Sequence, residues 1–422
     1  MAEDWPQWRG PSQSGLTSEL SGWDGTTWKI QKKWQVNVGS GMGASPILVD
    51  GKVYVMGWAD EGDQLQCLDA ASGNVLWKQQ YKARQDGRFR KGESAEGPTC
   101  TPTFDPRTRH LYTLGNDGDL YCWDAAKQGK PVWNLNLYDS FKVPARRSSA
   151  QTDPGRDYGY CGNVLLHQDW IIVEVGDKAS GNIFAFDKKS GKVLWRSQDK
   201  NRAGHNCGPV MMQIDGRPCV VSFTLEGLRV MRADKDHEGQ DIAWYPWVMP
   251  FNVNCPTPCV VGDTVILTGT DDYRSGKKTT FLKIGPKGIE KTWEGERQAY
   301  VCSPVAHQGY VYLFDNKLYC LELATGKLAW EGGKDLGGVA GSVLVSGDDK
   351  AILWNRNKLV LIESAKNSPK AYKELARIDN AIAGSQADCY PHLALAGGYL
   401  LVKNKAGDLA CYKVQQAALG GR

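Results

Sequence analysis

The chain of 422 residues contains 48 Gly, 16 Trp and 17 Tyr but only 7 Met, a usage that favours turns and strands over helices. Its 51 Lys and Arg nearly balance 47 Asp and Glu, and no apolar run is long enough to cross a membrane. These values exclude a disordered chain, a transmembrane protein and a strongly basic nucleic-acid binder.

The N-terminal segment opens with DWPQWRGP and has no apolar leader, as in a cytoplasmic protein or a trimmed, mature form. Its tryptophans are Trp5, Trp8, Trp23 and Trp28. We expect residues 1–28 to form an arm on the outside of a single propeller made by residues 29–422, with these tryptophans as its anchors rather than as ligand contacts.

One pattern then recurs along the chain: a strand, an acidic residue, a Gly-containing turn and an apolar strand with Trp. Clear copies span residues 67–80, 121–135, 184–197 and 319–332, and degenerate copies span 230–246 and 281–295. The tryptophans lie about 40 to 60 residues apart, which fits the four short strands of a propeller blade. Turn glycines such as Gly73, Gly191 and Gly326 supply the positive φ that the hairpin needs.

The end of the chain predicts how the ring closes. A seventh copy has Tyr372 in the Trp position, and the last copy, residues 407–414, lacks its outer strand. Residues 32–38, KKWQVNV, have the outer-strand pattern with no strand before them to pair with. We therefore predict an all-β, eight-bladed β-propeller closed by an N-terminal strand that pairs with the C-terminal blade.

Cysteine recurs where six of the eight innermost strands begin. The six positions are Cys100, Cys161, Cys207, Cys255, Cys302 and Cys389. We interpret them as small buried residues that face neighbouring blades near the axis, rather than as metal ligands. The same interpretation applies to the third-strand Cys67, Cys122, Cys320 and Cys411.

The repeats, with their Asp, their Thr/Ser-Gly-Lys turn and their docking Trp, resemble the tryptophan-docked repeats of the quinoprotein dehydrogenase superfamily. Residues 4–11, DWPQWRGP, resemble the mature start of exported PQQ-like repeat proteins of planctomycete-type bacteria. The resemblance implies a propeller in a periplasmic or otherwise extracytoplasmic location. It does not decide the chemistry, because the superfamily also contains non-enzymatic members such as the outer-membrane assembly lipoprotein.

The candidate site is one face of the propeller, around the mouth of its central channel. The loops that enter the innermost strands and the loops that join second and third strands share this face. Two long loops on this face, residues 81–99 and 138–160, carry many Lys and Arg. They are either solvated loops or a basic wall for an acidic ligand. Residues just before the small Cys, namely Tyr160, Asn206, Asn254 and Asp388, are expected to form a polar ring near the axis.

The individual candidates fall into three groups. The proton-transfer candidates are Tyr158, His205, Tyr300 and Asp388. The ligand-binding candidates are Arg156, Asn252, Asn254, Asp272, Arg274, Arg297 and Gln298. Asn254 and Asp271 are the candidates for a remnant calcium site.

Three functions follow from these candidates. The leading one is an extracytoplasmic PQQ-like propeller that binds a small molecule, a saccharide or a protein partner at the mouth without PQQ. The alternative is a carbohydrate-active hydrolase or lyase that uses arginines as anion clamps. A dehydrogenase dependent on PQQ and Ca²⁺ is least favoured, because the resemblance implies a vicinal disulfide and the chain has no adjacent Cys pair.

Overall fold

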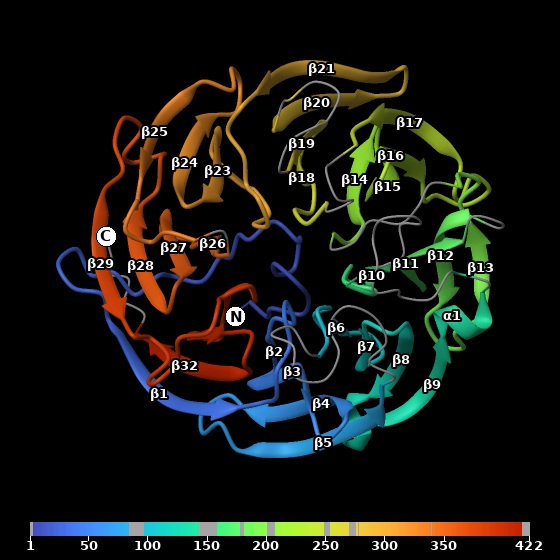
Figure 1. Ribbon diagram of the computed structural model, residues 1–422, viewed down its shortest axis with the longest axis horizontal. Coiled ribbons are helices and arrows are strands. Elements are labelled where there is room, and N and C mark those ends of the chain that lie inside the picture. The colour runs from blue at the N-terminus through green and yellow to red at the C-terminus, as the bar shows by residue number, and fades with distance from the viewer. Residues whose placement is uncertain are drawn as a thin grey trace.

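The computed structural model describes residues 3–83, 97–141, 143, 158–177, 181–200, 207–248, 254–269, 276, 278–338 and 340–415. Within these ranges the strands form eight four-stranded antiparallel sheets arranged radially about one axis (Figure 1). The predicted all-β, eight-bladed propeller is confirmed. The helical elements of the described chain are one turn of α-helix, α1 (Leu137–Ser140), and one 3-10 turn, η1 (Ala125–Lys127).

Each blade runs from the axis outward. Blades 1 and 2 comprise β2 (Ile47–Val49), β3 (Lys52–Ala59), β4 (Gly62–Asp69), β5 (Val75–Lys82), and β6 (Thr103–Asp105), β7 (His110–Leu114), β8 (Asp119–Asp124), β9 (Lys130–Asn136). Blades 3 and 4 comprise β10 (Leu165–His167), β11 (Trp170–Asp177), β12 (Gly181–Asp187), β13 (Val193–Arg196), and β14 (Val210–Ile214), β15 (Arg217–Thr224), β16 (Gly227–Arg232), β17 (Asp241–Pro246).

The second half of the ring repeats this order. Blades 5 and 6 comprise β18 (Cys259–Val261), β19 (Thr264–Thr268), β20 (Thr279–Gly285), β21 (Gly288–Gly295), and β22 (Val305–His307), β23 (Tyr310–Asp315), β24 (Lys317–Glu322), β25 (Leu328–Gly332). Blades 7 and 8 comprise β26 (Ser342–Val345), β27 (Lys350–Asn355), β28 (Lys358–Glu363), β29 (Glu374–Asp379), and β30 (Ala394–Ala396), β31 (Tyr399–Lys403), β32 (Asp408–Val414) with β1 (Ile30–Asn37).

Burial explains the lengths and patterns of the strands. The innermost strand β2 has three residues, all buried, because neighbouring blades crowd together at the axis. The outer strand β5 alternates exposed and half-buried residues over eight positions, as expected when one face packs and the other meets water.

The ring closes as predicted from the sequence. β1 pairs antiparallel with β32, and Trp34 lies opposite Cys411 with a bulge between Lys32 and Trp34. The first strand of the chain therefore completes the last blade, which removes an exposed edge from β32.

Outer-strand tryptophans dock onto the turn of the next blade. The Trp34 indole Nε1 donates to the carbonyl of Ala70 in blade 1 at 2.9 Å. The turn residue Gly73 has φ +75°, and a Cβ there would lie 2.7 Å from the Trp34 ring. Gly129 stands in the same relation to Trp77, so these glycines supply both the positive φ and the room for a neighbouring indole.

The N-terminal segment differs from expectation. Trp5 exchanges backbone hydrogen bonds with Leu48 of β2, in blade 1. Arg9 donates to the Pro304 carbonyl just before β22, in blade 6, and Gly15 accepts from Val345 of β26, in blade 7. Residues 3–19 thus cross the inner ends of the blades instead of packing on the outside (Figure 1). The physical reason is that the axis of an eight-bladed ring leaves space for large side chains such as Trp5 and Trp8, which are 2% and 7% exposed.

Candidate functional site

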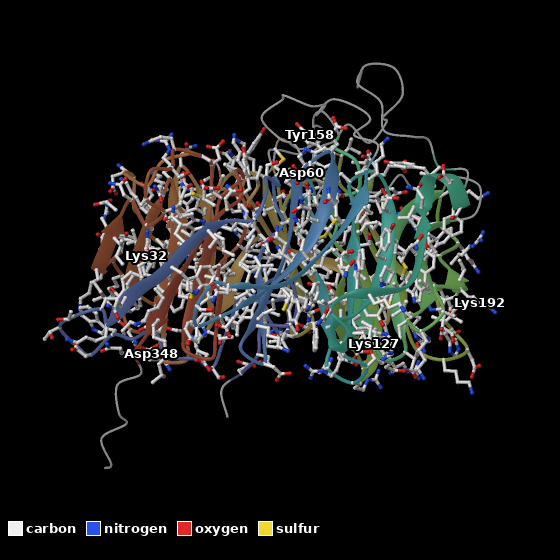
Figure 2. All side chains as sticks on the ribbon, turned by 90° about the horizontal axis from the view of Figure 1, so that it is seen from below. Lys32, Asp60, Lys127, Tyr158, Lys192 and Asp348 are labelled. Carbon is white, nitrogen blue, oxygen red and sulfur yellow. The ribbon has the colours of Figure 1, made fainter. Side chains whose placement is uncertain are left out.

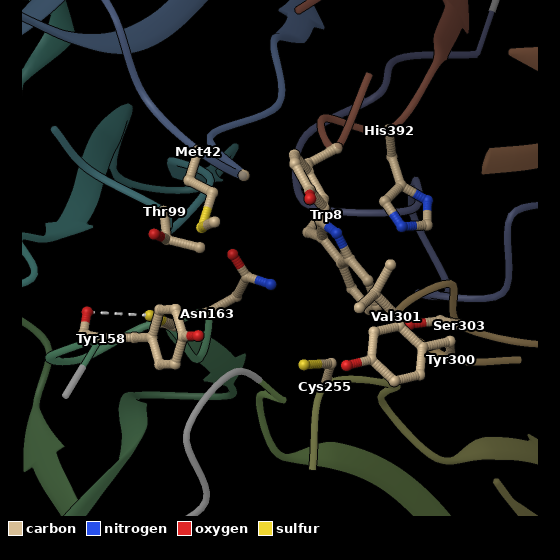
Figure 3. Close-up of a pocket in the computed structure, with 13 residues that line it drawn as sticks. Trp8, Met42, Thr99, Tyr158, Asn163, Cys255, Tyr300, Val301, Ser303 and His392 are labelled. Carbon is tan, nitrogen blue, oxygen red and sulfur yellow. Dashed lines mark hydrogen bonds between the residues drawn. The ribbon is translucent and has the colours of Figure 1, made fainter. Parts of the chain in front are cut away.

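A cavity of about 240 Å³ lies on the axis where the innermost strands begin (Figure 3). Its lining residues are Trp8, Met42, Gly43, Thr99, Tyr158, Cys161, Asn163, Cys255, Tyr300, Val301, Ser303, Tyr390 and His392. All except Trp8 belong to segments that lead into β2, β6, β10, β18, β22 or β30. Tyr158 lies on the same face as Asp60 of the β3–β4 turn, opposite Asp348 (Figure 2).

The N-terminal segment supplies one wall of the cavity. The Trp8 and His392 rings meet edge to face, with centroids 5.0 Å apart. The Arg9 guanidinium carbon lies 5.2 Å from the centroid of the Trp8 ring. Burial, with a smaller effect of the Arg9 charge, lowers the pKa of His392 to about 3, so its imidazole is neutral at physiological pH.

Tyrosines from two blades also line the cavity. Burial raises the pKa of Tyr300, and burial together with the nearby Asp388 carboxylate raises the pKa of Tyr390 to about 12. Both hydroxyls therefore remain protonated at neutral pH and can donate a hydrogen bond.

Several polar groups around the cavity have no partner in the described chain. The Asn163 side chain is 7% exposed, and its Oδ1 accepts from the Thr101 backbone at 2.7 Å. The Asn163 Nδ2 points into the cavity without a protein acceptor (Figure 3). The hydroxyls of Tyr300 and Tyr390 and the ring nitrogens of His392 likewise make no hydrogen bond to a described residue. Polar groups that face a cavity in this way are normally hydrogen-bonded to water or to a ligand.

Two cysteines belong to the cavity, which the sequence did not lead us to expect. The Cys161 Sγ contacts the Tyr158 carbonyl at 3.2 Å, and the half-buried Cys255 lies beside Tyr300 with its sulfur directed into the cavity (Figure 3). All twelve cysteines lie in the described ranges, none forms a disulfide, and eleven are buried. The interpretation as small buried residues covered ten of the twelve. It is confirmed as to burial for nine of them and is wrong for Cys255, which is half-buried.

The expected polar ring is wrong for two of its members. Asn254 is 2% exposed and donates to the Phe223 carbonyl. The Tyr160 hydroxyl, also buried, donates to the Val175 carbonyl at 2.9 Å. The Asn254 hydrogen bond joins blade 5 to blade 4, and the Tyr160 ring packs against Tyr138 of blade 2, with ring centroids 5.1 Å apart. Both side chains are thus turned into contacts between blades rather than toward the axis.

Three further candidates do not line the cavity. The Asp388 carboxylate is 2.7 Å from the Lys405 amine. The Arg297 guanidinium lies over the Tyr319 ring at 5.1 Å, and the Gln298 amide donates to Asp315 at 2.5 Å. Of the candidates, Tyr158 and Tyr300 are brought together at the cavity. The remaining candidates, Arg156, His205, Asn252, Asp271, Asp272 and Arg274, lie outside the described residues, as does most of both long loops.

The described lining does not fit a calcium-bound quinone. It contains no carboxylate and no arginine, whereas Ca²⁺ requires six to eight oxygen ligands that usually include carboxylates. Over the described ranges, no three His, Cys, Asp or Glu side chains are grouped so that they could hold a metal ion.

Eight four-stranded blades around an axial cavity, most of them joined by a docking Trp, are typical of a PQQ-like propeller. Residues 24–99 and 101–332 match the family described as outer membrane protein assembly factor BamB, and the chain belongs to that family. In the described part of the chain no helix is long and apolar enough to span a membrane.

Individual proteins show the same likeness at low identity. The dehydrogenase subunit of the quinone alcohol dehydrogenase of Acetobacter aceti is 28% identical over 190 residues, which cover 42% of this chain and 23% of that protein. BamB from Moraxella catarrhalis has a TM-score of 0.60 at 14% identity, over 92% of this chain and 99% of its own. The quinohemoprotein alcohol dehydrogenase of Comamonas testosteroni has a TM-score of 0.65 at 13% identity, over 99% and 82%. The two structures share the fold with this chain.

Proposed function

We propose that the protein is an extracytoplasmic propeller that binds a small-molecule ligand in its axial cavity, without PQQ. The observation that carries the proposal is the convergence of polar groups without protein partners. Asn163 comes from blade 3, Tyr300 from blade 6, and Tyr390 and His392 from blade 8. Membership of a family described as an outer membrane assembly factor supports the extracytoplasmic location.

The titration behaviour of the lining favours binding over proton transfer. General acid–base catalysis works best when a catalytic group has a pKa near the working pH. The pKa of His392 is about 3 and that of Tyr390 about 12, and burial raises the pKa of Tyr300 as well. These groups suit fixed hydrogen bonds better than proton transfer. They therefore favour a ligand-binding site over the site of a carbohydrate-active hydrolase or lyase.

The size of the cavity limits the ligand. A volume of about 240 Å³ lies below the range of about 300–1,000 Å³ that is typical of drug-sized ligands. A molecule no larger than one substituted ring therefore fits better than a segment of a partner protein.

The test is a thermal-shift screen of small metabolites against the purified chain. A ligand in the cavity raises the melting temperature, because binding to the folded state alone stabilises it. Tyr390→Phe, which removes one hydroxyl, should reduce the shift, whereas Tyr310→Phe, outside the cavity at the start of β23, should keep it. Ligands whose shifts are the same in both variants would place binding elsewhere.

Native mass spectrometry and cell fractionation test the other parts of the proposal. Protein isolated from its own host should carry a small molecule that is lost from the Tyr390→Phe variant and retained by Tyr310→Phe. Recovery of the protein from the cytoplasmic fraction would contradict the extracytoplasmic location.

A further inference from the structure

A buried cation without a carboxylate partner lies beside the cavity. Arg9 is 1% exposed, and its Nη2 donates to the carbonyls of Ser14, at 3.0 Å, and Pro304. Its Nε and Nη1 are buried without hydrogen-bond partners, and the side chain that faces it is the Cys259 thiol rather than a carboxylate. The guanidinium lies 5.2 Å from the centre of the Trp8 ring and, after burial, is the second cause of the lowered pKa of His392, so its charge acts on two residues that line the cavity.

A second buried cation lies behind the part of the cavity wall that is formed by the segment before β2. Lys403 is fully buried, and its Nζ donates weakly to the Gly41 carbonyl at 3.4 Å. Gly41 is followed directly by Met42 and Gly43, which line the cavity. Asp408 of β32 is the charged group that faces Lys403.

This second charge is only partly compensated. The Asp408 carboxylate accepts hydrogen bonds from Asn37 and Asn404 rather than from the ammonium. Burial lowers the pKa of Lys403 to about 7. A buried cation of this kind is stabilised by any anion that comes close to it.

The cavity presents donors to such an anion. Asn163 Nδ2 and the hydroxyls of Tyr300 and Tyr390 can each donate, and the described lining offers no competing carboxylate. A carboxylate accepts several hydrogen bonds at once through its two oxygens. Trp8, Val301 and other apolar side chains can contact the organic part of a ligand, which an inorganic anion lacks.

From the two buried cations, the donors and the apolar walls, we infer that the axial cavity binds a small organic carboxylate. The inference rests on the proposed function, because it names the chemical class of the ligand in the same cavity.

The probes are benzoate and benzamide, which have the same shape and differ in charge. Calorimetric titration at pH 6.5 should show benzoate binding at least tenfold more tightly than benzamide. Lys403→Met should weaken benzoate at least tenfold and leave benzamide unchanged, and Arg9→Met should do the same where it folds. Lys405→Met is the matched control, since Lys405 lies two residues further on and pairs with Asp388 at 2.7 Å.

The pH dependence provides a second measurement. An anion in the cavity raises the pKa of Lys403 above its value of about 7, so benzoate binding takes up a proton. Benzoate affinity should therefore fall as the pH rises from 6 to 9, whereas benzamide affinity should not. In the Lys403→Met variant the benzoate affinity should lose this dependence.

Each other result overturns the inference in a distinct way. Equal binding of benzoate and benzamide would exclude a preference for carboxylates and leave the proposed ligand site standing. Tight binding of inorganic phosphate without benzoate would indicate an inorganic anion site. If neither benzoate nor benzamide binds at tens of millimolar, the carboxylate class is wrong, and the independent screen and mass spectrometry decide whether the proposed function fails too.

Discussion

At the scale of single residues, the inner part of this propeller contains bases whose protonation is opposed by burial. His392 and Lys403 come from the same blade, and burial lowers the pKa of His392 to about 3 and that of Lys403 to about 7. Both groups gain protons when the chain unfolds, so both make stability depend on pH. They do so in different pH ranges, which allows each effect to be measured separately.

Lys403→Met should stabilise the protein. Replacing a buried charge by an apolar side chain of similar size gains about 1–4 kcal/mol. The pKa of Lys403 is about 7 in the folded chain and about 10.4 when unfolded. The unfolded state therefore binds more protons between these values, and the contribution of Lys403 to stability rises with pH across that range. Urea unfolding should show a larger gain at pH 6 than at pH 10.

The control for this prediction is Lys405→Met, which removes a more exposed cation paired with Asp388. It should change the free energy of unfolding by less than about 1 kcal/mol. A Lys403→Met variant less stable than the parent at pH 6 would show that the ammonium is well compensated in the fold.

His392 should make the fold sensitive to acid. Its pKa of about 3 in the folded state lies below the unfolded value of about 6.5, so stability is lost as the pH falls through this interval. The loss amounts to at most about 1.4 kcal/mol for each pH unit. His392→Gln should shift the midpoint of acid unfolding to lower pH, as followed by tryptophan fluorescence. The exposed His237→Gln should leave the midpoint unchanged.

At the scale of secondary-structure elements, adjacent blades are joined by one recurring contact. The indole of an outer strand lies against the turn glycine of the next blade, as Trp77 does against Gly129. The contact combines two requirements at one residue, a positive φ and the absence of a Cβ.

Gly129→Ala should separate these two requirements when it is compared with Gly216→Ala. The two glycines have φ of +72° and +73°, but a Cβ on Gly129 would lie 2.4 Å from the Trp77 ring and one on Gly216 would touch nothing within 4 Å. Gly216→Ala should cost about 1–2 kcal/mol for the left-handed backbone. Gly129→Ala should cost about 1–3 kcal/mol more for overpacking, measured by chemical denaturation. Equal costs would show that the indole moves aside without penalty.

At the scale of the whole molecule, the N-terminal region acts twice on the ring. β1 completes the last blade beside β32, and residues 3–19 run across the inner ends of the blades, from blade 1 to blades 6 and 7. The N-terminal region therefore both closes the ring, through β1, and forms one wall of the cavity, through Trp8.

Trp34→Ala should weaken the closed ring strongly. Trp34 is 9% exposed and joins the closing strand to blade 1 through Ala70 and Gly73. Truncating a buried Trp costs about 3–5 kcal/mol. Trp244→Ala, at a residue that is 36% exposed, should cost clearly less. Similar losses in the two variants, measured by thermal unfolding, would contradict a special role for the closing contact.

The site was predictable only in part. Tyr158 and Tyr300 were among the candidates, and the cavity lies on the face where the innermost strands begin. Asn163, Cys255 and His392 were missed. We expected the residue before each small Cys to face the axis, whereas in these three cases it is the Cys itself or a residue after it. Strand alternation, followed one or two residues further, is the signal that points to Asn163.

The blades, their number, the turn glycines and the strand that closes the ring could all be predicted from the sequence. The blades and turns follow from local periodicity, and the closing pair was recognised because a strand at each end of the chain lacked a partner. The positions of Trp8, Arg9 and Lys403 could be seen only in the folded molecule. Trp8 reaches the cavity, and the two cations are buried beside it. In the described chain, neither cation has a carboxylate within ion-pair distance. Such placements depend on the space that eight blades leave at the axis, and no segment of the sequence records that space.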